Sequence, residues 1–66
     1  MVYTVKQARC IKEKTQKEMA ELMGISRDSY RKIEREPWKA TVQQAYTISR
    51  ITGIPVDQIF FADKST

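Results

Sequence analysis

The sequence predicts an all-α fold in which five short helices form one compact domain. Helix-start and helix-stop signals recur at regular intervals along the chain. No segment alternates apolar and polar residues for long enough to indicate a strand. A length of 66 residues fits a single domain with a small core, so we expect one domain over residues 1–66, with a loose tail at 62–66.

Each expected helix begins at a capping signal. Thr4, Thr15 and Thr41 are each followed three residues later by Gln or Glu. This is the pattern of a capping box, in which the hydroxyl group and the later side chain satisfy backbone N–H groups reciprocally. Ser26 can cap a helix alone, and Pro55 suits a first helical position. The expected helices are residues 4–13, 16–23, 27–35, 42–52 and 55–61.

Apolar residues recur at helical spacing and mark the faces that we expect to be buried. This spacing explains the Met and aromatic residues without a cofactor site. The single cysteine, Cys10, permits no internal disulfide and is expected to be an inert packed thiol. The expected core residues are Met19, Ala20, Met23, Ile25, Tyr30, Ile33, Val42, Ala45, Tyr46, Ile48, Ser49, Ile54, Ile59 and Phe60.

The segment "MAELMGISRDSY", residues 19–30, breaks one helix and begins another within a few residues. Gly24 tolerates the left-handed backbone that such a turn needs, and Ile25 is placed to fill the corner between the helices. Two short helices joined by a tight turn containing glycine form a helix-turn-helix. We therefore expect this motif over about residues 16–35.

The helix at 27–35 is expected to present a polar, mostly basic face. Tyr30 and Ile33 point to one side, whereas the opposite side carries Asp28, Arg31, Lys32 and Arg35, with Arg27 on the flank. An α-helix fits the major groove of DNA, and a helix-turn-helix presents the first turns of its second helix to base edges. This pattern favours double-stranded DNA as the partner.

The charge distribution favours the same class of partner. The chain has a net charge of +4, and residues 1–39 hold ten of the 12 basic residues but only six of the eight acidic ones. All of the excess positive charge therefore lies in the first part of the chain, which indicates a polyanionic partner for that part. The alternative is a small, mildly basic domain without such a partner.

The segment "TQKEMAELMGISRDSYRKIE" resembles the helix-turn-helix of the Cro/C1-type family. This family contains the lambdoid phage repressors, the Cro proteins and their bacterial xenobiotic-response-element relatives. The likeness extends from Val5 to Phe60 and includes the ending "ITGIPVDQIF". It implies a five-helix, lambda-repressor-like domain that regulates transcription by binding a near-palindromic operator, usually as a homodimer.

The resemblance also implies roles for individual residues. Arg27, Asp28 and Lys32 match base-reading positions, and Arg9 and Glu34 match a structural ion pair. For Asp28, a favourable interaction with the positive end of its helix is an equally weighted alternative. The residues expected at the DNA backbone are Gln16, Lys17, Ser26, Arg31, Arg35, Lys39 and Thr41.

The C-terminal part is expected to form the dimer interface through Ile54, Val56, Ile59 and Phe61, together with Trp38. For Trp38 the alternative is local cover of the core edge.

Several positions depart from the family pattern. Glu13 and Lys14 stand where relatives often have glycine and an aliphatic residue, and Ile33 stands where many have tryptophan. Pro55 replaces the usual Ser or Thr cap. The segment "REPWKA" lacks the glycine that is common after Glu34, so its path is not fixed by the resemblance.

Composition argues against other classes of function. The chain has no histidine, no glycine-rich phosphate loop and no nucleophile–base set, so we expect neither an enzyme nor a small-molecule substrate. We also expect no cofactor, no metal and no membrane contact, and a cytoplasmic, nucleoid-associated location in a bacterial or phage-infected cell. The alternative function is a helical protein-interaction module, such as an antitoxin-like partner.

Overall fold

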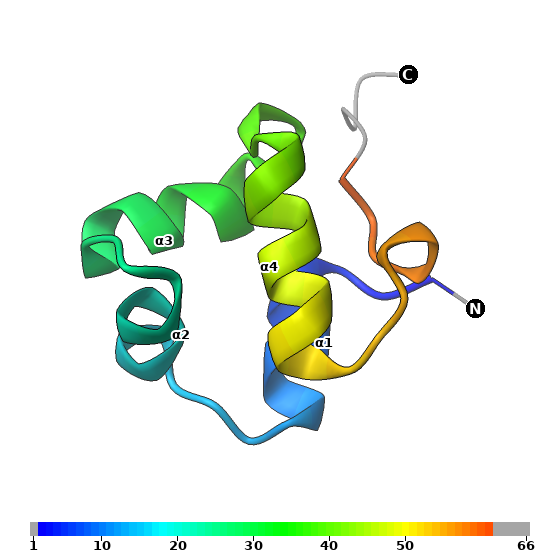
Figure 1. Cartoon of the computed structure of the whole chain (residues 1–66), viewed down its shortest axis with the longest axis horizontal. Coiled ribbons are helices and arrows are strands. Elements are labelled where there is room, and N and C mark those ends of the chain that lie inside the picture. Colours follow the sequence, from blue (N-terminus) through cyan, green and yellow to red (C-terminus); the bar gives the residue numbers. More distant parts are fainter. Residues whose placement is uncertain (1, 62–66) are drawn as a thin grey trace.

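The computed structural model describes residues 2–61, and Figure 1 shows how its helices are arranged. Within these residues there are four α-helices and two short 3₁₀ helices, in agreement with the expected all-α class but with one α-helix fewer. The helices are α1 (Val5–Ile11), α2 (Gln16–Met23), α3 (Arg27–Arg35), η1 (Pro37–Lys39), α4 (Val42–Thr52) and η2 (Val56–Gln58).

The capping signals determine where the α-helices begin. All three expected capping boxes are present at Thr4, Thr15 and Thr41, with both reciprocal bonds formed in each. Ser26 begins α3, and its hydroxyl oxygen accepts a bond from the backbone N–H of Ser29 at 3.1 Å. Gly24 ends α2 with a φ of 70°, a left-handed conformation that glycine adopts without strain. The expected helix-turn-helix is therefore confirmed.

The prediction of a fifth α-helix at 55–61 is wrong. Only the single 3₁₀ turn η2 forms there, and the chain then becomes extended. The backbone N–H of Phe60 donates to the carbonyl of Tyr3 at 2.7 Å, and the N–H of Tyr3 donates to the carbonyl of Gln58 at 2.8 Å. These bonds form an isolated parallel bridge between Tyr3 and Ile59, which takes the place of helical hydrogen bonds.

Helix α1 is shorter than the expected 4–13 because it ends in a Schellman motif. The N–H of Glu13 donates to the carbonyl of Cys10, and the N–H of Lys14 donates to the carbonyl of Arg9. Glu13 has a φ of 55°, and it is the one non-glycine residue between residues 2 and 61 with a positive φ. Glutamate therefore adopts the conformation for which relatives often carry glycine.

Glu13→Gly is expected to raise the free energy of unfolding by about 0.5–1 kcal/mol, because glycine adopts the left-handed conformation without a Cβ penalty. Chemical denaturation of both proteins measures the change. Lys12→Gly is the matched control: Lys12 has a φ of −92°, so glycine there relieves no strain and is expected to destabilise the domain. Equal or lower stability of Glu13→Gly would show that contacts of the glutamate side chain outweigh the backbone strain.

The core lies between α1, α2, α3 and α4. Its buried apolar residues are Val5, Ala8, Met19, Ala20, Tyr30, Ile33, Ile48, Ile54 and Ile59. Val5 and Ala8 in α1 were not among the expected core residues, nor was Thr52, which is buried with its hydroxyl group bonded to the carbonyl of Ile48 at 2.8 Å.

For three of the residues expected in the core, the prediction of burial is wrong. Val42, Tyr46 and Phe60 are 73%, 56% and 40% exposed. Val42 and Tyr46 lie one turn apart on α4, whereas Ile48 and Thr52 supply the buried face of that helix. Cys10 is also exposed, contrary to the expected packed thiol. Among residues 2–61, no helix has the length and apolar character needed to cross a membrane.

Candidate nucleic-acid interface

Helix α3 separates its apolar and polar residues onto two faces, as the sequence predicts. Tyr30 and Ile33 are buried against the rest of the domain. The outward-facing residues are Arg27, Asp28, Arg31, Lys32 and Arg35, all exposed. Figure 1 shows α3 at the edge of the molecule, beside α2 and crossing near one end of α4. The polar face of α3 is therefore free to meet a large partner.

Cationic side chains line hollows near both ends of α3. A hollow of about 460 Å³ lies at the start of α2, where Gln16, Lys17 and Arg27 contribute to its wall. A second hollow, of about 450 Å³, lies between the end of α3 and η1, where Lys32, Arg35 and Lys39 contribute. Six of the residues expected at DNA are thus grouped around α3.

Three of the charged residues expected at DNA, Lys39, Arg31 and Asp28, already have ion-pair partners. Lys39 Nζ lies 2.9 Å from Glu36 Oε1, and this contact lowers the pKa of the Glu36 carboxyl group. Arg31 Nη1 lies 3.9 Å from Asp28 Oδ1, between side chains that are 55% and 90% exposed. Exposed pairs of this kind contribute little stability.

The capping residues Ser26 and Thr41 hold the starts of α3 and α4. The oxygen of each hydroxyl group accepts a backbone N–H, at 3.1 Å for Ser26 and 3.0 Å for Thr41. Both residues are exposed. Their structural task is thus to begin the two helices that border the second hollow.

Arg9 and Glu34 form a close pair beneath this surface. Arg9 Nε donates to Glu34 Oε2 at 2.6 Å, and the two side chains are 12% and 8% exposed. Arg9 Nη1 also donates to the carbonyl of Lys14 at 2.8 Å, which ties the α1–α2 loop to the pair. The contact joins α1 to α3, the helix that carries the exposed basic face.

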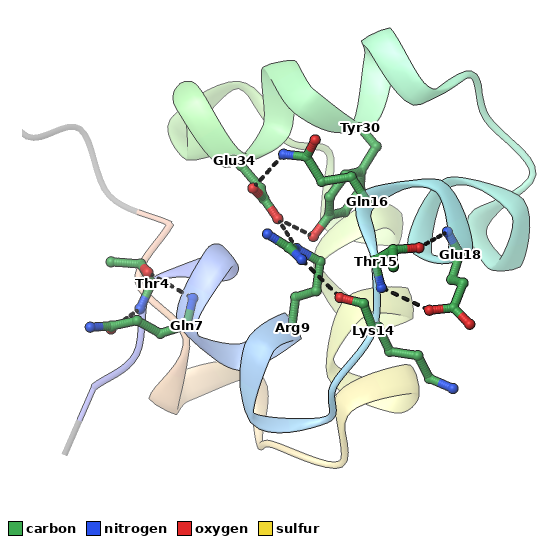
Figure 2. A network of polar contacts seen from close by, with 9 residues as sticks. All are labelled: Thr4, Gln7, Arg9, Lys14, Thr15, Gln16, Glu18, Tyr30 and Glu34. Carbon is green, nitrogen blue, oxygen red and sulfur yellow. Dashed lines mark hydrogen bonds and ion pairs between the residues drawn. The ribbon is translucent and has the colours of Figure 1, made fainter.

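Glu34 accepts two further hydrogen bonds that the sequence did not indicate (Figure 2). The Tyr30 hydroxyl group donates to Oε2 at 2.7 Å, and Gln16 Nε2 donates to Oε1 at 3.0 Å. The bond from Tyr30 could have been predicted, because Tyr30 and Glu34 lie four residues apart on one helix. Gln16 lies 18 residues away in another helix, and no local pattern links it to Glu34.

These contacts set the protonation states of the network. Burial raises the pKa of Glu34, but the bonds from Arg9, Tyr30 and Gln16 outweigh burial and hold that pKa below its usual value. The bond to Glu34 raises the pKa of Arg9. Burial, assisted by Glu34, raises the pKa of Tyr30. At neutral pH the network therefore contains a carboxylate, a guanidinium group and a neutral phenol.

A match to a family model establishes the relationship of this chain to known proteins. The model, described as Helix-turn-helix, matches residues 5–59. The chain belongs to the Cro/C1-type helix-turn-helix family. Searches of curated proteins and of solved structures found no match. The resemblance expected from the sequence is confirmed, and this Cro/C1-type protein is a DNA-binding helix-turn-helix regulator from a family that is not enzymatic.

Two residues expected at the dimer interface of this Cro/C1-type domain are placed elsewhere. Ile54 and Ile59 are 9% and 5% exposed and belong to the core of the single domain, so they offer almost no surface to a second copy. Ile59 also forms the extended bridge to Tyr3. Trp38, Val56 and Phe61 are partly exposed.

Acid is expected to weaken this Cro/C1-type domain through Glu34. The folded-state pKa of Glu34 lies below its value in the unfolded chain, about 4.3, so the stabilisation is fully present above that pH. As the pH falls further, the unfolded chain binds a proton first, and stability falls until the folded state is protonated too. The free energy of unfolding of the Glu34→Gln variant should depend less steeply on pH than that of the wild type. Denaturant unfolding between about pH 2 and 5 measures both dependences. An unchanged pH dependence would exclude Glu34 as a source of the acid sensitivity.

Proposed function

We propose that this domain is a sequence-specific transcriptional regulator of the small phage-repressor or Cro-like type, which binds an operator with α3 in the major groove. The observation that carries the proposal is the exposed polar face of α3, bordered near both ends by cation-lined hollows. A helix of this kind fits the groove while cations on either side meet phosphates. This arrangement would repress transcription when the operator overlaps a promoter.

Base reading is assigned to the exposed first turns of α3. Arg27 and Lys32 are donors, and guanine presents the paired acceptors O6 and N7 in the major groove. Asp28 is suited to accept from cytosine N4, in competition with its contact to Arg31. The residues proposed at the backbone remain Gln16, Lys17, Ser26, Arg31, Arg35, Lys39 and Thr41.

The proposed operator is near-palindromic, and two copies of the domain bind half-sites about one helical turn apart. Trp38, Val56 and Phe61 are the residues proposed for contact between the copies, because their side chains keep exposed area. Three partly exposed residues form a small patch, which supports association of two copies on DNA rather than a strong dimer in free solution. The proposed location is the nucleoid.

A binding selection from random DNA tests the proposed reading by α3. Arg27→Ala is expected to weaken binding to the selected site by about 1–3 kcal/mol and to relax the preference at one base pair, because the variant cannot bond to guanine. Lys39→Ala is the matched control: a phosphate contact carries no base information, so binding should weaken about equally on all sequences. An unchanged base profile for Arg27→Ala would make Arg27 a phosphate anchor and leave the reading to Asp28 and Lys32.

A further inference from the structure

The two carboxylate oxygens of Glu34 bind different partners. Oε2 accepts from both Arg9 and Tyr30, whereas Oε1 accepts from Gln16 alone. A carboxylate can only accept, so the amide of Gln16 must turn its nitrogen toward Glu34. Figure 2 shows this nitrogen directed at Glu34 and the amide oxygen directed away from it.

We propose that Glu34 is a positioning residue of the DNA interface, acting through Gln16. One N–H of the Gln16 amide is held by Glu34, and the second has no acceptor within residues 2–61, so it can donate to a phosphate oxygen. Gln16 begins α2 and lines the same hollow as Lys17 and Arg27, so the held amide faces the proposed path of the DNA backbone. The inference rests on the proposed function, because it concerns how that binding surface is prepared.

The position of the carboxylate is well determined before any ligand arrives. Glu34 is 8% exposed, and bonds of 2.6 Å from Arg9 and 2.7 Å from Tyr30 hold its other oxygen. Gln16 is therefore bonded to a fixed point instead of moving freely in water. A side chain that is ordered before binding loses less conformational entropy when the complex forms.

Gln43 provides the internal comparison. It is exposed, and its side chain makes no hydrogen bond within residues 2–61. In the free wild-type protein, ¹⁵N relaxation should show a more restricted side-chain amide for Gln16 than for Gln43. Equal mobility of the two amides would overturn the proposal without any substitution being made.

A double-mutant cycle measures the contribution to DNA affinity. The apolar variant carries Arg9→Met, Tyr30→Phe and Glu34→Met together, which removes the acceptor for Gln16 without leaving a buried unpaired charge. It is expected to bind the selected operator about two- to tenfold more weakly than the wild type, since Gln16 must then be ordered on binding. In a Gln16→Met background, the same three substitutions should leave affinity unchanged.

Two further variants separate this role from a general effect on folding. Tyr30→Phe removes one of the two bonds that hold Glu34 but keeps the contact to Gln16, so it should lower the melting temperature and weaken DNA binding much less than Glu34→Asp. Glu34→Asp keeps a negative charge near Arg9 but draws both carboxylate oxygens back by one methylene, which withdraws the acceptor from Gln16 and lengthens the contacts to Arg9 and Tyr30. It should loosen the Gln16 amide and weaken binding even if the apolar variant fails to fold.

The possible failures are distinguishable. If the wild type binds no DNA, the proposed function fails, and the inference fails with it. Suppose instead that the wild type binds DNA, and that the three apolar substitutions weaken binding by the same factor whether position 16 is Gln or Met. In that case the inference alone fails. An affinity loss for Tyr30→Phe equal to that of Glu34→Asp would also overturn it, because a general structural role would then explain both results.

Discussion

Affinity for the operator is expected to fall by about 10²- to 10⁴-fold between about 50 and 200 mM salt. Each phosphate neutralised by a cation releases counterions, and we expect roughly 4–8 phosphates to be neutralised per dimer. The slope of log affinity against log salt concentration should then be about −4 to −7. Titration of labelled operator DNA by fluorescence anisotropy at several salt concentrations measures this slope.

Charge-removing variants show which residues produce the slope. Arg35→Gln should make it less steep by about 1 for each phosphate that is no longer neutralised, which is about 2 per dimer. Arg50→Gln is the matched control, because Arg50 is exposed on α4 and lines neither of the two hollows beside α3. If affinity did not change with salt concentration for any promoter tested, the result would argue against DNA binding. It would favour the alternative function, a protein-interaction module.

Arg9→Ala is expected to lower the free energy of unfolding by about 2–4 kcal/mol, because Glu34 would remain buried with its charge unpaired. The carbonyl of Lys14 would also lose its donor. For a domain of this size, such a loss lowers the melting temperature by roughly 10–30 °C. Thermal unfolding followed by circular dichroism measures the shift.

Arg31→Ala is the matched control for this prediction. It removes the surface pair with Asp28, whose charged atoms lie 3.9 Å apart and are mostly exposed to water. The expected change is between about 0 and 1 kcal/mol. If Arg9→Ala and Arg31→Ala shifted the melting temperature equally, the buried pair would contribute no more than a surface contact.

The starts of the α-helices could be predicted from the sequence because they depend on local chemistry. Thr4, Thr15 and Thr41 each lie three residues from the side chain that completes the capping box, so one short window contains the whole signal. Gly24 similarly marks the end of α2 by its own conformational preference.

The other features depend on contacts between distant parts of the chain. The extended end at Ile59 forms because Tyr3 supplies its hydrogen-bonding partners, and no local pattern contains that information. Glu13 adopts a left-handed conformation that its side chain does not favour, since the Schellman bonds at the end of α1 impose it. The apolar residues Val42 and Tyr46 fit helical spacing but face solvent, because neighbouring helices select the other face of α4.

The orientation of α3 at the candidate interface could be predicted from the sequence, whereas the contact between Gln16 and Glu34 could not. The exposed face of α3 follows from the positions of Tyr30 and Ile33, which fix the rotation of the helix. The bond between Gln16 and Glu34 could not be anticipated, since it requires the packing of α2 against α3. For that reason the sequence assigns Glu34 only to the ion pair with Arg9.

The parallel bridge between Tyr3 and Ile59 has a practical consequence for attaching other molecules to this domain. It holds the two ends of the described chain together, on the side of the molecule away from α3 (Figure 1). A fluorescent label attached beside the bridge would therefore lie away from the polar face of α3 and would leave that face uncovered. A bulky attachment on this side is therefore expected to hinder contact between copies through Val56 and Phe61 while leaving α3 free to meet DNA.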